Sequence, residues 1–398
     1  MTTHNLKSDG KPEYCPPAAT CDKFLWILWI ALSVAGVFGI SQRFIGGHTA
    51  AGYGSYVPWG LWIGLYFLGV GISGGTFIIG TVGYLFEIRG FSKRSDLRTT
   101  IVLSLAALLP AFIGVTLDLG RPERLFNILA YPSFTSMMAF NGWMYNIFMV
   151  IAVIAWLLSF SDRSPWLKPI LVTAAFFSVL FPSQSGVFFE AVRTNAFWHS
   201  PILSVLFLAS AIALGGAGLV VVKGAMGPDS GSDSDVQTHH AALSGLRVVA
   251  AFAVIVYLVF EFAEFSIAFW NPGSHSPNVV YLLFGDYWPV FWILHVFAGS
   301  LIPLALFSTG SKGAWAAASV LLLVGFAAAR MNVLIPGQIA GQIAGLQQAF
   351  QDVRLMYSYH PTTMEYLVGC SMPAVGMAVF YIGMRLTATI ASGREKGA

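Results

Sequence analysis

The chain has 398 residues, of which 56% are hydrophobic and only 10% are charged, and its mean hydropathy is +0.72. Soluble globular chains are about one-quarter charged, so this composition excludes a water-soluble globular domain and indicates a protein whose solvent is lipid. The net charge of +3 is too small and too dispersed to indicate binding to nucleic acid.

Ten apolar segments are each long enough to cross the hydrocarbon core, which takes about 20 helical residues. The first begins near Phe24 after a polar tail that lacks the order of a signal peptide, so we expect it to be retained as a membrane helix. The fold class is therefore predicted to be all-α, a polytopic membrane protein of ten helices packed in bundles. The expected spans are residues 24–42, 57–86, 99–118, 135–160, 168–190, 201–224, 244–268, 288–308, 312–335 and 365–388.

Lysine and arginine in short loops favour the cytoplasmic side of a membrane. With the N-terminus inside, fifteen of the 21 basic residues fall on the cytoplasmic side, five fall outside and Arg330 lies within a span. Both termini are therefore predicted to be cytoplasmic. The polar stretch 227–235 has the composition of a flexible linker. The expected organisation is a cytoplasmic tail (1–23), a six-helix group (24–226), a cytoplasmic linker (227–243), a four-helix group (244–390) and a second cytoplasmic tail (391–398).

The chain has few side chains suited to redox-active metals. Its three cysteines, Cys15, Cys21 and Cys370, are too few for an iron–sulfur cluster, which normally takes four thiolates. A b-type haem needs facing axial ligands, and His295 is the one histidine well inside an expected span. We expect no metal site, haem or cluster in this chain, so any cluster belongs to a partner. For Cys15 and Cys21, an ordinary tail and a two-thiol site both remain open.

Ionisable residues within the expected spans gather toward one end, the outer half under the predicted topology. Such groups are costly in lipid unless they face protein or water, so each is a candidate functional residue. His295 and Gln184 lie within about two turns of the same side, and together these residues predict a polar cavity that opens outward. The ionisable residues are Asp118, Glu190, Glu261, Glu264, Arg330 and Glu365.

Glu261 and Glu264 are three residues apart and share one face of a helix. Two carboxylates in this arrangement repel each other unless one is protonated or a cation such as Arg330 is near. The pair therefore indicates proton handling. For Asp118 and Glu190, an interfacial role with a paired charge is an equally open alternative.

Seven short segments occur in order on successive expected helices. This order resembles the NrfD/PsrC-like integral membrane subunits, named for polysulfide reductase and nitrite reductase complexes. The likeness is closest to the longer ten-helix branch that includes DsrP and the hydrogenase-2 membrane subunit. The segments are PWGLWIGLYFLGVGISGG (58–75), LDLGRPER (117–124), FPSQSG (181–186), FEFAEF (260–265), FWILH (291–295), ARMN (329–332) and YHPTTMEYL (359–367).

The resemblance implies a quinone-reactive subunit of a respiratory redox complex, in the inner membrane of a prokaryote and without redox cofactors of its own. It implies menaquinone or ubiquinone near the outer face, beneath a periplasmic ferredoxin-like iron–sulfur subunit, with further subunits beyond. His295 stands where the hydrogenase-type pattern has a carboxylate, so the proton chemistry there is expected to differ. The candidates for the quinone pocket or its proton path are Asp118, Gln184, Glu261, Glu264, His295, Arg330, His360 and Glu365.

Two other functions are compatible with the sequence. A secondary transporter or proton channel without its own redox role would use charges near mid-depth and broken helices. Pro182 and Pro303 favour such breaks, whereas the one-sided ionisable groups do not. A purely structural anchor is the third hypothesis, and it explains ten spans poorly because one or two helices suffice to tether a complex.

Overall fold

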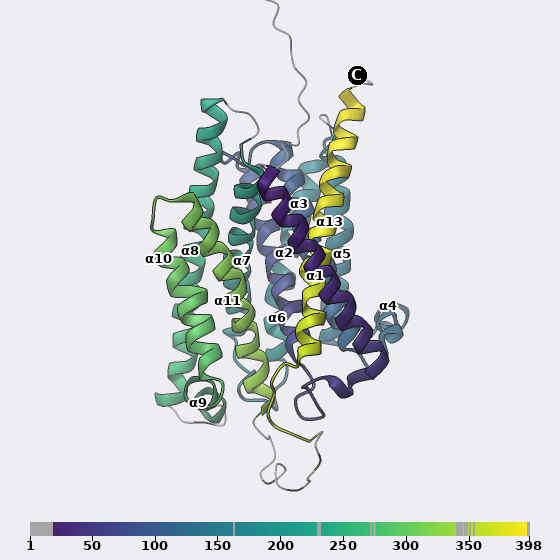
Figure 1. The fold of residues 1–398 in the computed structure, drawn as a ribbon, viewed down its shortest axis with the longest axis vertical. Coiled ribbons are helices and arrows are strands. Elements are labelled where there is room, and N and C mark those ends of the chain that lie inside the picture. Colours follow the sequence, from purple (N-terminus) through teal and green to yellow (C-terminus); the bar gives the residue numbers. More distant parts are fainter. Residues whose placement is uncertain are drawn as a thin grey trace, which may run out of the picture.

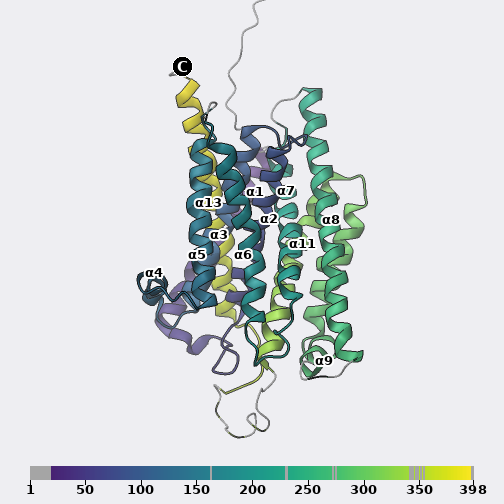
Figure 2. The same cartoon turned by 180° about the vertical axis from the view of Figure 1, so that it is seen from behind.

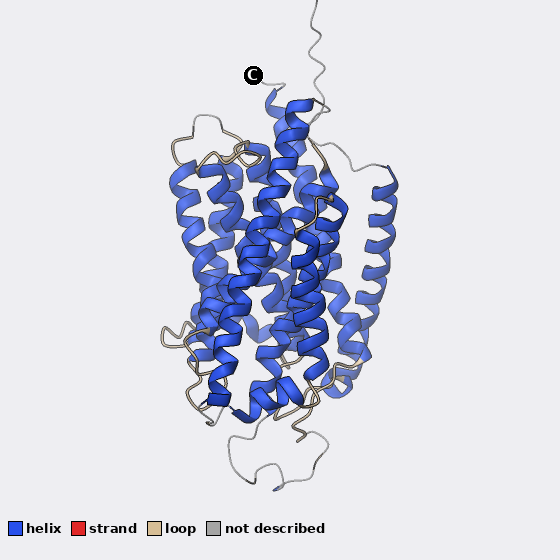
Figure 3. Ribbon diagram, turned by 90° about the vertical axis from the view of Figure 1, so that its left-hand side faces the viewer, coloured by secondary structure: helices blue, strands red, loops and turns tan. Residues whose placement is uncertain are grey.

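The computed structural model describes residues 19–161, 164–228, 232–270, 273, 276–339, 345, 349, 352 and 355–395. These residues form helices and connections without a strand, and ten of the helices are long and apolar enough to cross a membrane (Figure 3). Each matches one expected span, so the all-α membrane class is confirmed. The expected N-terminal tail up to residue 18, with Cys15, lies outside the described residues.

Nine spans are continuous α-helices, and one combines two helix types. That span is a π-helix, η3 (Pro289–Leu301), followed by the short helix α10 (Ile302–Phe307). Short elements connect the spans: η1 (Gly47–Ala50), η2 (Pro122–Phe126), α4 (Asn127–Ala130) and α9 (Ser276–Phe284). The long helices are α1 (Ala19–Gly46), α2 (Leu61–Leu85), α3 (Arg94–Asp118), α5 (Met137–Leu158), α6 (Leu167–Glu190), α7 (Leu203–Met226), α8 (Asp233–Trp270), α11 (Lys312–Ile339) and α13 (Thr363–Glu395).

Several helices reach further than their apolar runs predicted. α8 begins at Asp233, inside the expected linker, and α11 continues to Ile339, beyond its expected end at residue 335. α1 begins at Ala19 and α13 ends at Glu395, both inside the expected tails. Hydropathy detects only the part of a helix that lies in lipid, so polar turns at either end escape it. α6 also runs unbroken through Pro182, whereas Pro303 lies where the π-helix gives way to α10.

The helices pack as two groups of four and an outer pair. α2, α3, α5 and α6 form the first bundle, and α7, α8, η3–α10 and α11 form the second. α1 packs along α13, which in turn packs on α3 (Figures 1 and 2). The predicted division at residues 227–243 follows the chain, whereas the packing places α7 with α8 and α13 with α1.

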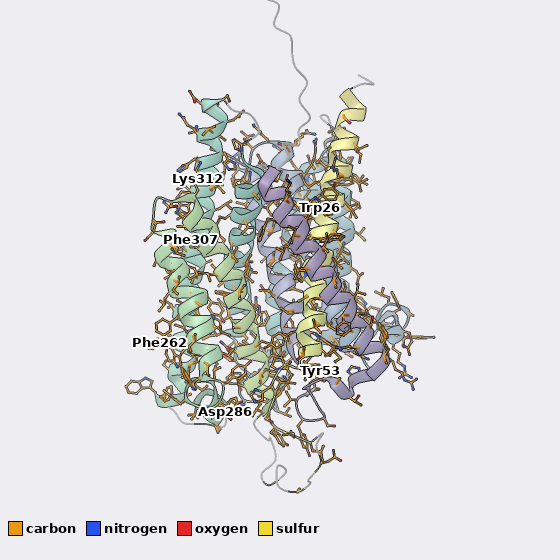
Figure 4. The ribbon with its side chains drawn as sticks, viewed as in Figure 1. Trp26, Tyr53, Phe262, Asp286, Phe307 and Lys312 are labelled. Atoms are coloured by element: carbon orange, nitrogen blue, oxygen red, sulfur yellow. The ribbon has the colours of Figure 1, made fainter. Side chains whose placement is uncertain are left out.

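Both ends of the described chain lie at one end of the bundle, here the terminal end, and the opposite end is the distal end (Figure 1). Successive spans alternate in direction, so α3 and α6 end at the distal end and α13 begins there. Figure 4 labels Tyr53 and Asp286 near the distal end and Lys312 toward the terminal end. Two ion pairs, Lys223 with Asp96 and Lys93 with Asp235, join elements at the terminal end.

The two bundles meet where α2 and α7 bring their backbones together. A Cβ added at Gly75 would lie 1.7 Å from the Ala211 carbonyl oxygen, and one at Gly215 would lie 2.1 Å from the Gly75 carbonyl carbon. Small residues permit such approach in membranes, where packing rather than the hydrophobic effect drives helix association. The joint between the bundles therefore depends on these two glycines.

We expect Gly75→Ala to lower stability by about 1–3 kcal/mol or more, because its methyl group would overlap the α7 backbone. Gly224→Ala is the matched control, since nothing lies within 4 Å of a Cβ at that position in α7. The measurement is the midpoint of thermal unfolding in detergent. Equal midpoints for the two variants would contradict the close joint.

Candidate functional site

Three buried acceptor oxygens lie near the distal end of the first bundle. Asp118 closes α3, Asn141 lies in the second turn of α5, and Gln184 lies about two turns before the end of α6. Within the described chain, Asp118 Oδ1, Asn141 Oδ1 and Gln184 Oε1 have no hydrogen-bond partner. Asn141 Nδ2 donates to the Gln184 carbonyl oxygen at 3.3 Å. Buried polar atoms nearly always have partners, so the two amide oxygens of Asn141 and Gln184, which we call the acceptor site, are suited to a ligand that brings donors. Asp118 has other neighbours, since Glu365 and Arg43 lie within electrostatic reach of its carboxylate.

An aromatic layer lies deeper in the same bundle. Tyr66 of α2, Phe112 of α3 and Tyr145 of α5 have ring centroids 5.8–6.4 Å apart. The hydroxyls of Tyr145 and Ser185 are hydrogen-bonded at 3.0 Å, and Ser185 is the residue after Gln184 in α6. Phe112 precedes Asp118 by six residues, about 9 Å along the helix. The acceptor site therefore sits on the distal side of an apolar, aromatic floor.

Arg43, in the last turn of α1, caps the end of α3 beside Asp118. It is only 6% exposed. Its Nε donates to the Leu117 carbonyl at 2.9 Å, and its Nη2 donates to the Leu119 carbonyl at 3.1 Å. A cation at a helix C-terminus satisfies free carbonyls and complements the helix dipole. Arg43 also lies within electrostatic reach of Asp118, as does the carboxylate of Glu365.

Arg43 continues into a short chain of hydrogen bonds. Its Nη2 contacts His48 Nε2, and His48 Nδ1 contacts the Tyr53 hydroxyl. A guanidinium can only donate, so His48 Nε2 must accept the hydrogen bond from Arg43. The ring proton of a neutral His48 is then on Nδ1, which donates a hydrogen bond to the Tyr53 hydroxyl. Burial, with the nearby charge of Asp118, raises the pKa of Tyr53 above its ordinary range, so its phenol stays protonated. Sequence reasoning did not detect these bonds, because Arg43 and His48 were assigned to a loop.

Glu365, in the first turn of α13, is completely buried, and donors surround its carboxylate. Oε2 accepts from Gly52 N at 2.8 Å and from Thr362 N at 3.0 Å and Oγ1 at 3.2 Å, and Oε1 accepts from the Tyr359 hydroxyl at 2.6 Å. Tyr359 accepts in turn from Leu61 N at 2.7 Å. Burial and the charge of Glu365 raise the pKa of Tyr359, which keeps it a donor. These contacts support a structural tie between α13 and the start of α2.

The second bundle holds a buried acid–base pair. His295 Nε2 lies 3.0 Å from Glu261 Oε2, and the Tyr257 hydroxyl donates to Glu261 Oε1 at 3.2 Å. His295 lies in the π-helix η3, which packs so tightly on α11 that a Cβ at Gly299 would lie 2.5 Å from the Gly325 Cα. Single π-turns occur often at functional sites. The counter-group of Glu261 is therefore His295 rather than the expected Arg330.

Arg330 and Asn332 of α11 are buried close to this pair. Arg330 Nη2 donates to Ser210 Oγ at 2.7 Å, and its guanidinium lies 4.2 Å from the centre of the Phe207 ring. Within the described residues, neither amide atom of Asn332 has a partner, nor does His295 Nδ1. Asn332 lines a narrow cavity whose other walls are Phe197, Leu203, Leu206, Tyr257, Glu261, Glu264, Phe265 and Val333. The walls are mainly apolar, and the polar side chains of Asn332, Tyr257, Glu261 and Glu264 provide the hydrogen-bond partners that a buried water requires.

The remaining predicted residues lie at the edges of these groups. Glu264 accepts from Ser200 Oγ at 2.7 Å. Glu190 Oε1 accepts from Ser204 N at 2.8 Å and so satisfies a free amide at the start of α7, which supports the interfacial reading of this residue. His360 is exposed, although its carbonyl oxygen packs against Gly52 at the edge of the Glu365 group. Among the described residues, no cluster of three or more His, Cys, Asp or Glu side chains is arranged to hold a metal ion.

The structure thus distributes the predicted residues over three groups at the distal end rather than one cavity. Sequence reasoning missed Asn141, Tyr257 and Asn332, which are not charged and so attracted no notice within apolar runs. Asn332 closes the ARMN segment, and that position was the one signal available for it.

The fold and the buried groups together describe a helical membrane protein with ten candidate spans and with buried acidic and basic side chains toward one end. The family described as Polysulphide reductase, NrfD matches residues 50–342, and the chain belongs to this family. A protein of Mesobacillus selenatarsenatis named as a selenate reductase subunit is 24% identical to the chain over 92% of it and 93% of the relative. The Hdr-like menaquinol oxidoreductase integral membrane subunit of Archaeoglobus fulgidus is 25% identical, covering 85% and 87%.

A third relative, from Halobacterium salinarum, is named as a putative membrane subunit of dimethyl sulfoxide reductase and is 25% identical over 90% of both chains. These relatives are named as subunits of reductases or oxidoreductases, two of them expressly as membrane subunits. The chain is accordingly a multi-pass membrane protein of the NrfD family, and these relatives are named as subunits of redox enzymes.

We expect Glu365→Gln to lower the free energy of unfolding by about 1.5–3 kcal/mol. The amide loses the negative charge, and its NH2 group would face N–H and O–H groups that now donate to the carboxylate. Glu123→Gln, at an exposed carboxylate of η2, is the control. Thermal unfolding in detergent measures both. A Glu365→Gln protein as stable as the control would contradict the structural tie.

Proposed function

We propose that this chain is the quinone-reactive membrane subunit of a respiratory complex, and that the acceptor site binds the oxygens of the quinone ring. Bound there, menaquinone or ubiquinone would supply the two-electron, two-proton chemistry that this chain lacks. The observation that carries the proposal is the pair of buried amide oxygens without donors, on Asn141 and Gln184, where the Asn141 side chain donates a hydrogen bond to the Gln184 backbone. A quinol brings two hydroxyl donors, which these oxygens are fit to accept.

The two amides suit both redox forms of the ligand. After a flip, an Asn or Gln side chain presents its nitrogen in place of its oxygen. Asn141 and Gln184 can therefore accept from quinol hydroxyls and donate to quinone carbonyls. The aromatic floor of Tyr66, Phe112 and Tyr145 supplies the apolar surface that ligand pockets combine with a few placed polar groups.

Asp118 is the group we propose as the proton acceptor of the site. Its Oδ1 is free of hydrogen bonds within the described chain, and its surroundings contain both Glu365 and Arg43. Arg43 is held by the Leu117 and Leu119 carbonyls, so the cation stays in place whatever the state of the carboxylate. Burial and the nearby Glu365 favour the protonated form of Asp118 and Arg43 favours the ionised form, so both states are accessible to a proton acceptor.

We further propose that the distal end faces the periplasm and binds a ferredoxin-like iron–sulfur subunit, in the inner membrane of a prokaryote. The fifteen-to-five bias of basic residues supports a cytoplasmic terminal end. The word menaquinol in the name of the Archaeoglobus relative supports menaquinone as the ligand. Electrons would then pass between the quinone pool and the clusters of that partner at the end that holds the acceptor site.

The second bundle supports proton conduction as a further part of the function. Glu261, the partner of His295, lines the Asn332 cavity together with Glu264 and Tyr257, so an acid that is paired with a base borders this space. Toward the terminal end, Thr76 and Thr81 of α2 have buried hydroxyls without a partner in the described chain. A water-assisted path through the bundles requires polar groups at successive depths, and we propose that Thr76 and Thr81 provide two of them.

Asn141→Leu and Gln184→Leu should each weaken the binding of a quinone analogue about tenfold, because each removes one hydrogen bond of about 1–1.5 kcal/mol. Fluorescence titration of the complex measures the affinity. Asn146→Leu in α5 and Ser183→Ala in α6 are matched controls, since both side chains bond to their own helix. Unchanged affinity in both test variants would refute the acceptor site.

Asp118→Asn should retain analogue binding but lower quinol oxidation by about a hundredfold, the usual contribution of a positioned proton acceptor. Turnover of the whole complex with a soluble electron acceptor gives the rate, and the same titration gives the affinity. If rate and affinity both stay at the wild-type level, Asp118 is not the proton acceptor.

Glu261→Gln and His295→Gln should abolish proton movement while electron transfer continues. The test reconstitutes the complex in liposomes with a pH-sensitive dye and compares protons moved per electron. Glu123→Gln at the exposed η2 position is the control. A wild-type proton-to-electron ratio in both variants would remove the second bundle from the proton path.

A further inference from the structure

The connection between α3 and α5, residues 119–136, carries large apolar side chains in the open. Phe126 is 70% exposed, Leu129 53%, Tyr131 79% and Phe134 82%. Connections between helices are normally polar, and an exposed patch of this kind marks an interaction surface. We call these four side chains the α4 patch.

The segment is held against α5 rather than lying loose. Trp143 Nε1 donates to the Ile128 carbonyl at 3.2 Å, and the Phe134 and Trp143 rings are 5.2 Å apart. The Ile128 side chain packs over Gly142, where a Cβ would lie 3.4 Å from it. Ile128 therefore fixes one side of α4 to α5, while the α4 patch stays uncovered.

The segment that carries the patch lies at the flank of the bundle, toward the distal helix ends (Figures 1 and 2). Both views show α4 projecting from the flank of the bundle rather than beyond its end (Figures 1 and 2). Phe44 and Ile45 at the end of α1 are likewise exposed, and Arg43 of the same turn donates to the Leu119 carbonyl where the segment begins. The patch thus continues the lipid-facing surface of a membrane span.

Two exposed arginines accompany the apolar side chains. Arg121 precedes η2 and Arg124 lies within it, with Glu123 between them. Phenylalanine, tyrosine and arginine together are typical of segments at the boundary between acyl chains and head groups, where arginine reaches lipid phosphates. We propose that η2 and α4 lie in the interfacial layer of the bilayer, with the α4 patch among acyl chains and Arg121 and Arg124 on lipid phosphates.

This anchor would fix the distal ends of the two helices that it joins. Asp118 immediately precedes the segment and Asn141 follows it by five residues. Lipid contact would therefore hold the spacing of two positions in the first bundle. The inference stands on exposure and placement alone and does not depend on the proposed quinone chemistry.

Spin labels test the placement in the full-length protein with its three native cysteines changed to serine. Nitroxides at F126C and F134C, with E123C as the control, are measured in vesicles of phosphatidylcholine and phosphatidylglycerol. We expect the ratio of oxygen access to nickel-chelate access to be several-fold higher at 126 and 134 than at 123. Oxygen concentrates in acyl chains, whereas the chelate stays in water.

Two results would overturn the proposal. Labels at 126 and 134 that match the control place the patch in water, and labels shielded from both reagents place it under protein, such as a partner or a second copy. The double variant R121Q/R124Q should lower the ratio at 134 toward that at 123, with R193Q, an exposed arginine at the same end, as its control. An unchanged ratio in R121Q/R124Q would refute the phosphate contact.

Discussion

A polar side chain inside a membrane must find its partners within the protein, because the hydrocarbon offers none. Most buried polar groups of this chain obey the rule. Glu365 accepts four hydrogen bonds, and Glu261 lies between a tyrosine and a histidine. The exceptions among the described residues are therefore informative. They include Arg330 Nε and Asn332 in the second bundle, and at the distal end of the first bundle they are oxygens of Asp118, Asn141 and Gln184.

The scaffold places two kinds of site at the same end of the molecule. The glycine joint between α2 and α7 sets the bundles side by side, so that the acceptor site of one and the Glu261–His295 pair of the other share the distal end. Glu365 ties α13 across to the start of α2, and Arg43 caps α3 from α1. The outer pair of helices thus braces the bundle in which we propose the quinone binds.

The ten spans could be predicted because a span requires only a run of about 20 apolar residues, and the length of such a run can be counted in the sequence. Asp118, Glu261 and His295 could be found because ionisable residues are rare in such runs. The partners of Glu365 could not, since they include the backbone N–H of Gly52, and a backbone donor has no sequence signature. Asn141 escaped for a related reason: an uncharged amide costs less in a span and does not stand out.

Packing was the other gap. The polar stretch before α8 suggested a boundary, yet α7 and α8 pack together across it, because small residues and shape decide helix contacts in lipid while linker composition reports only on solvent exposure. The sequence did not predict the π-helix η3 either. Gly299 of this helix packs on the backbone of Gly325 in α11, and such a contact between distant residues has no local sequence signal.

The most direct test of the central claim is photochemical labelling of the whole complex with an azido-quinone, followed by mass spectrometry of the modified peptides. The account predicts labelled residues on α5 and α6 around Asn141 and Gln184, suppressed by excess unlabelled quinol. Label confined to α8 and α11, or spread over lipid-facing residues and insensitive to competition, would contradict it.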